Sequence, residues 1–144
     1  MNARLTFAMA GLAAGLFAVQ AAGAAETKFT LALTGGQETP PNASTGTGSG
    51  TASYDDSTHI FKYSIAYSGL ADVAAAHFHG PAAPGKAAPP TLPIDKSALA
   101  SPIAGQATLT DAQAKDLLAG NWYFNVHTKS VPGGEIRGQV TAAK

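Results

Sequence analysis

The sequence of 144 residues contains no cysteine. Disulfide bonds are therefore excluded, and so are a lipid anchor on an N-terminal cysteine and the blue-copper and thiolate-zinc sites that need a thiolate ligand. Charged residues are also scarce: they make up 12% of the chain, with a formal net charge of zero. A neutral chain with so few basic residues lacks the electrostatic footprint of a protein that binds nucleic acid or an anionic membrane surface.

The N-terminal residues have the pattern of an export signal. Arg4 precedes an apolar stretch over residues 5–19, and an alanine-glycine-alanine triplet at 22–24 matches the small-x-small cleavage pattern. A transmembrane anchor is the alternative, but the stretch is short for a bilayer and ends in small residues. We expect residues 1–25 to be a cleaved signal peptide. Residues 26–144 would then form one periplasmic or extracellular domain, without membrane insertion.

Alternation of apolar and polar residues predicts an antiparallel β-sheet. The clearest case is 59–68, where every second residue from Phe61 to Tyr67 is large and apolar or aromatic. The small residues of 45–50 indicate a flexible approach to the next strand, and the scattered prolines of 80–102 exclude a long helix. The expected strands are 28–34, 51–54, 59–68, a strand that includes 77–79, 91–94, 103–110, 122–128 and 135–141.

One helix is predicted after residue 110. Thr110 can cap its N-terminus with Gln113 as the capping-box partner, Leu117 and Leu118 would face inward, and Gly120 is placed to end it. A single short helix among about seven or eight strands predicts an all-β fold, an antiparallel Greek-key sandwich or barrel with a crossing helix.

Three of the four histidines form a candidate metal site. In a strand, His77 and His79 project from the same face while Phe78 points to the other, and at about 6.6 Å of Cα separation both imidazoles can reach one ion. His127 lies on the face of its strand opposite to Trp122. The alternative is that these are polar residues of half-buried strands without a ligand.

The fourth histidine, His59, opens a strand, and we interpret it as a surface residue rather than as a ligand. Three neutral imidazoles suit copper, zinc or nickel better than a hard cation such as calcium. Copper(II) is the first choice, because affinity peaks there among the divalent metals, and zinc is the second. Asn125 or Glu135 could hydrogen-bond to the ring nitrogen of a ligand imidazole that does not bind the metal.

Four separated stretches resemble the signature of the CHRD domain, a module that occurs in chordin and alone in exported bacterial proteins. They are GQETPP at 36–41, AHFHGPA at 76–82, LLAGNWYFNVHT at 117–128 and PGGEIRGQ at 132–139. The resemblance covers essentially all of the chain after the predicted signal peptide. It implies an all-β secreted domain without implying a defined activity.

A weaker resemblance connects the histidines with copper/zinc superoxide dismutases, in which a His-x-His strand and a late histidine bind copper. His77 and His79 resemble the first pair, His127 resembles the late ligand, and Arg137 after the glycines at 133–134 resembles the arginine beside the metal. The zinc ligands, the bridging histidine and the disulfide cysteines of that family have no counterpart here. Only the copper-binding half of the dismutase metal site therefore has counterparts in this sequence.

Three functions therefore remain open. The first is an exported copper-binding protein with a site on His77, His79 and His127. The second is a non-catalytic interaction or structural module, which self-associates or binds an extracellular protein and in which the histidines bond to neighbouring backbone. The third is superoxide dismutation, with Arg137 attracting the anion, although one arginine in a neutral protein supplies little steering.

Overall fold

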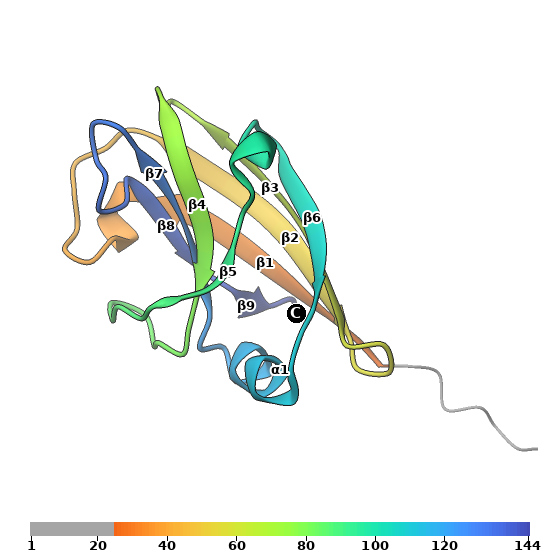
Figure 1. Cartoon of the computed structure of the whole chain (residues 1–144). Helices are drawn as coiled ribbons and strands as arrows, with labels where there is room; N and C mark the ends of the chain where they lie inside the picture. Colours follow the sequence, from red (N-terminus) through yellow and green to blue (C-terminus); the bar gives the residue numbers. More distant parts are fainter. Residues whose placement is uncertain (1–24) are drawn as a thin grey trace, which may run out of the picture.

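The computed structural model describes residues 25–144, so the predicted signal peptide lies, apart from its last residue, outside the described part. These residues form nine strands and one α-helix (Figure 1). Two short 3-10 turns, η1 (Gly35–Gln37) and η2 (Lys96–Ala98), lie in the connections. The elements are β1 (Glu26–Thr34), β2 (Thr47–Asp55), β3 (Ile60–Ser68), β4 (Val73–His79), β5 (Pro90–Pro93), β6 (Ile103–Thr108), α1 (Asp111–Leu118), β7 (Tyr123–Thr128), β8 (Ile136–Gln139) and β9 (Thr141–Ala142).

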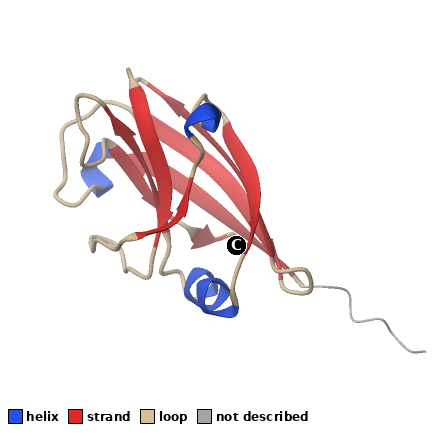
Figure 2. Ribbon diagram, in the orientation of Figure 1, coloured by secondary structure: helices blue, strands red, loops and turns tan. Residues whose placement is uncertain are grey.

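All strands belong to one antiparallel sheet with the order β5-β4-β7-β8-β1-β2-β3-β6, and β9 pairs with β1. The sheet curls on itself as a half-barrel, with α1 near one end (Figures 1 and 2). The curl brings distant strands together: the ring of Phe61 on β3 packs edge-on against Phe78 on β4, at 5.2 Å between centroids. The predicted all-β antiparallel fold with one short helix is confirmed, as a single curled sheet.

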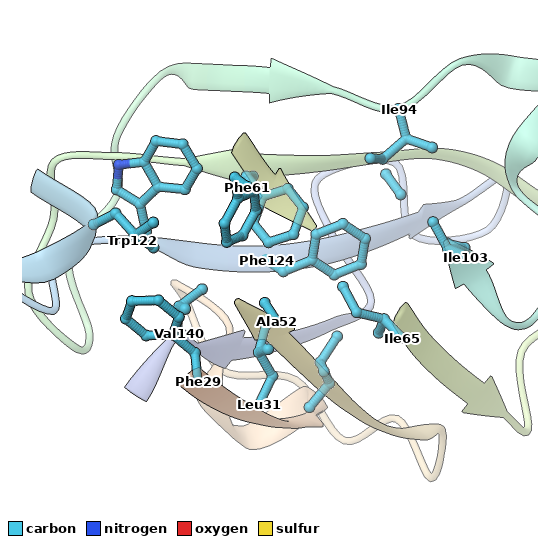
Figure 3. Close-up of a cluster of buried hydrophobic side chains, with 14 of the residues drawn as sticks. Phe29, Leu31, Ala52, Phe61, Ile65, Ile94, Ile103, Trp122, Phe124 and Val140 are labelled. Carbon is cyan, nitrogen blue, oxygen red and sulfur yellow. The ribbon is translucent and has the colours of Figure 1, made fainter. Parts of the chain in front are cut away.

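The core lies inside the curl and comes from alternate residues of the strands (Figure 3). Each such strand turns its apolar face inward because burying a large apolar side chain contributes about 1.5–3 kcal/mol. The side chains that are at most 2% exposed include Phe29, Leu33, Phe61, Ile65, Phe78, Ile103, Leu117, Trp122, Phe124, Val126, Ile136 and Val140.

The expectation of a flexible segment at 45–50 was wrong, since β2 begins at Thr47 and pairs with β1 and β3 along its whole length. Its glycines permit close approach of the neighbouring strand. A Cβ on Gly50 would lie 2.7 Å from Cγ1 of Ile65, and one on Gly48 would lie 3.0 Å from the carbonyl oxygen of Ala66. A run of small residues here therefore marks tight packing of strands rather than flexibility.

The segment 80–102 is largely irregular, as predicted, and contains the short edge strand β5, which pairs with β4.

The helix α1 has the predicted capping box: the Thr110 hydroxyl accepts from the Gln113 amide, and the Gln113 side chain accepts from the Thr110 amide. Leu117 is buried, but Leu118 is 47% exposed, because consecutive helical residues point about 100° apart. Within the described residues no helix is long and apolar enough to cross a membrane.

Thr110→Ala is expected to lower the free energy of unfolding by about 1 kcal/mol, because it leaves the Gln113 amide without its partner. Urea denaturation followed by circular dichroism measures the loss. Thr110→Ser keeps the hydroxyl and serves as the control. An equal loss in both variants would contradict a capping role.

Candidate metal centre

The site lies on the face of β4 and β7 that points away from the core. Phe78 and Phe124 are fully buried on the core side, so the residues on either side of each in its own strand must project to the other face. Antiparallel pairing sets His77 opposite Asn125, and Ala75 opposite His127. The three histidines thereby converge: one ring nitrogen from each of His77, His79 and His127 lies within 4.8 Å of the others.

His77 and His127 form the tightest pair of the cluster, with 3.1 Å between Nδ1 of His77 and Nε2 of His127. Two nitrogens that bind one tetrahedral ion at about 2.05 Å each lie about 3.3 Å apart, so this spacing is close to that of two ligands. On the other side of its ring, Nδ1 of His127 lies 2.9 Å from the Pro132 carbonyl oxygen, to which it can donate. That contact leaves Nε2 of His127 with a lone pair toward the cluster.

His79 is held from both sides by oxygen atoms. Its Nδ1 lies 2.9 Å from the Ala88 carbonyl oxygen, and its Nε2 lies 2.9 Å from Oδ1 of Asn125. A neutral imidazole carries only one N–H, so it can donate to only one of these acceptors. His79 can become a third ligand when it gives up one of the two contacts by turning its ring. Its contact with Ala88 also shows that the segment 80–102 covers this side of the site.

Burial favours the neutral form of the two histidines on β4. It lowers the pKa of His77 below the usual imidazole value, and the charges of His127 and His79 lower it further. Burial also lowers the pKa of His79, against the opposing effect of its bonds to Ala88 and Asn125. A neutral imidazole is the form that binds metal, so these two side chains are in the ligand state at neutral pH.

The two residues expected to hold a ligand imidazole differ in outcome. Asn125 is buried and contacts His79 through Oδ1, as described above. Glu135 does not contact the cluster: its carboxylate accepts from the hydroxyls of Thr128 and Ser44. It therefore closes the turn after β7 rather than orienting a ligand.

The alternation of residues 135–141, with Ile136 and Val140 toward the core, predicts that Arg137 points outward, but Arg137 is only 2% exposed. It does lie on the side of β8 away from the apolar core, but there its guanidinium covers the ring of Tyr123 at 3.5 Å and donates to Thr39. The ring of Tyr123 in turn stacks on His79, with centroids 4.7 Å apart and planes 3° from parallel. Tyr123 thus lies between Arg137 and His79, so that the guanidinium contacts the tyrosine ring rather than the histidine cluster.

His59 lies apart from the cluster, as the sequence indicated: its side chain is 42% exposed and 3.5 Å from Asp111. Sequence reasoning missed Tyr123, which fixes the plane of His79 and contacts the Ala88 backbone through its hydroxyl. Its position two residues before Asn125 and four before His127 was the available signal. The sequence gives no indication of the contacts made by the Ala88 and Pro132 carbonyl oxygens, because every residue has a backbone carbonyl group.

The model of the CHRD domain family matches residues 29–140, from β1 to the residue after β8. The match includes all three histidines of the cluster, together with Tyr123 and Arg137. The comparison with curated proteins found no match, and neither did the comparison with solved structures.

Proposed function

Starting from the premise that this chain belongs to the CHRD domain family, we propose that it is an exported metal-binding protein whose preferred ion is copper. The observation that carries this proposal is the convergence of His77, His79 and His127 within 4.8 Å of one another. Export is supported by the signal-like pattern of residues 1–25.

The donor set supports copper as the first choice. The chain has no cysteine thiolate, and in the part that the structure describes the cluster includes no carboxylate. Three imidazoles alone suit Cu(II) and Zn(II), and the affinity order of divalent metals favours Cu(II). His77 and His127 supply the closest pair of nitrogens, and His79 supplies the third. The contact from His127 to Pro132 fixes which of its nitrogens faces the ion, as partners of metal ligands commonly do.

Titration of the purified protein with Cu(II), followed by calorimetry and electron paramagnetic resonance, tests the proposal. We expect saturation at one ion per chain and a spectrum with nitrogen hyperfine structure from imidazole ligands. A His59→Ala variant is the matched control and should give the same spectrum, because His59 lies outside the cluster.

Two results would count against this function. A spectrum without nitrogen coupling would contradict the histidine site itself. Tighter binding of Zn(II) than of Cu(II), measured in the same buffer by competition with a chelator, would keep the site but overturn the choice of copper.

A further inference from the structure

A second polar site lies on the far side of Tyr123 from the histidines. It is a cleft of about 320 Å³ between the loop that follows β1, the Pro84–Gly85 turn and β8. Its walls include Glu38, Thr39, Arg137 and Gln139, and none of the three clustered histidines lines it. The volume falls within the range of about 300–1,000 Å³ that is typical of small-molecule sites.

Two buried side chains of opposite charge line this cleft. Arg137 is 2% exposed and Glu38 is 6% exposed. Their charges attract one another, yet they form no ion pair within the part of the chain that the structure describes. Burial raises the pKa of Glu38 above its usual value, against the opposing effect of hydrogen bonds from the Asn125 side chain and the Thr39 backbone and of the Arg137 charge. A buried charge that has no counter-charge in contact is costly, because its lost hydration is compensated only in part. Such a pair therefore favours a ligand that brings a counter-charge to each group.

Among the described residues that line this cleft, three buried side-chain atoms have no hydrogen-bond partner. Nη2 of Arg137 is a donor without an acceptor, because the bond from Arg137 to Thr39 is made by Nη1. Oε1 of Gln139 is an acceptor without a donor, and Oε1 of Glu38 has no donor at hydrogen-bond geometry, although the Asn125 side chain near it lowers the pKa of that carboxyl. The Gln139 side chain cannot turn freely to change this, because its Nε2 already donates to two carbonyl groups, of Ala82 and Gly120, at 2.9 Å each.

These groups define the ligand by complementarity. Arg137 is best paired with an anionic hydrogen-bond acceptor. Glu38 and Gln139 are best paired with a hydrogen-bond donor, and a cationic group is the strongest such donor. A simple anion would be repelled by Glu38, and a simple amine would be repelled by Arg137. A neutral sugar would leave both charges without a counter-charge. A small zwitterion, with its carboxylate and ammonium groups close together, satisfies all three atoms.

We propose that this cleft binds a free α-amino acid, with the carboxylate on Nη2 of Arg137 and the ammonium group donating to Glu38 and Gln139. The proposal does not depend on the metal site. It assigns a ligand to the Gly36–Pro41 loop, whose residues the copper proposal leaves without a role.

The test is a titration of the purified protein with glycine and L-alanine, followed by backbone amide shifts in NMR spectra. EDTA is present throughout, so that an amino acid cannot register through a bound metal. We expect a dissociation constant at or below about 1 mM and the largest shifts at Gly36 and Gly85. Acetate, methylammonium and glucose should each bind at least about tenfold more weakly than glycine. Equal binding of acetate or of glucose, or no shifts around the cleft, would overturn the proposal.

Glu38→Gln gives a second measurement, because it removes the charge while keeping the size of the side chain. We expect glycine to bind at least about tenfold more weakly to this variant, whereas Glu26→Gln, at an exposed position of β1, should bind normally. Unchanged binding in Glu38→Gln would contradict the proposed contact with the ammonium group. The comparison of ligands on the unmodified protein decides the question even where the variant does not fold.

Discussion

Replacement of both His77 and His127 by alanine is expected to lower the affinity for Cu(II) by more than about 100-fold. Even residues that only support a metal ligand contribute about 10–100-fold to affinity, so the loss of two ligands should exceed that range. These two residues are the closest pair of the cluster, and only His79 would remain. Competition with a chelator of known affinity measures the change.

The double variant should remain folded, because both imidazoles are only partly buried and lie on the face away from the core. His59→Ala removes a partly exposed imidazole elsewhere and serves as the matched control. A double variant that binds Cu(II) as tightly as the unmodified protein would place the copper site outside the cluster.

Phe78→Ala is expected to lower the free energy of unfolding by about 3–5 kcal/mol. Phe78 is fully buried, and four aromatic rings surround it at centroid distances from 4.7 to 5.9 Å: those of Phe61, Tyr63, Trp122 and Phe124. Its truncation leaves a cavity that these rigid rings cannot fill. Small domains have a total stability of about 5–15 kcal/mol, so this single change removes a large part of it.

Urea denaturation of Phe78→Ala and of Leu118→Ala tests this expectation. Leu118 is 47% exposed, so its truncation should change the stability by no more than about 0.5 kcal/mol. A loss below about 1 kcal/mol in Phe78→Ala would mean that the core can collapse around the missing ring.

Much of the fold could be predicted from the sequence because period-two alternation is a local property of each strand. The alternation around Phe78 and Phe124 was sufficient to assign the histidines to the face away from the core. The pairing of β4 with β7, which brings His77 within reach of His127, joins residues about 50 positions apart and has no local signal. It could be anticipated only through the resemblance to other folds.

The burial of Arg137 could not be predicted for a similar reason. Alternation correctly placed it on the side of β8 away from the apolar core, but an outward residue is exposed only when nothing covers that side. Here the loop after β1 folds over β8, held by the Asn42 side chain, which donates to the Gly134 and Glu135 carbonyl groups. Asn42 and its acceptors are more than 90 residues apart, so the position of this loop over β8 cannot be predicted from the residues near Arg137 in sequence.

The position of β7 has a consequence for the lifetime of the histidine cluster. This strand has neighbours on both edges, β4 and β8, and five of its six residues are buried. Segments at the margins of the fold, such as the two-residue β9, can open by local unfolding at little cost, whereas we expect β7, paired and buried as it is, to separate from β4 at close to the cost of unfolding the domain. The backbone positions of His77, His79 and His127 are therefore set by the fold itself, and the three imidazoles stay near one another for as long as the chain is folded.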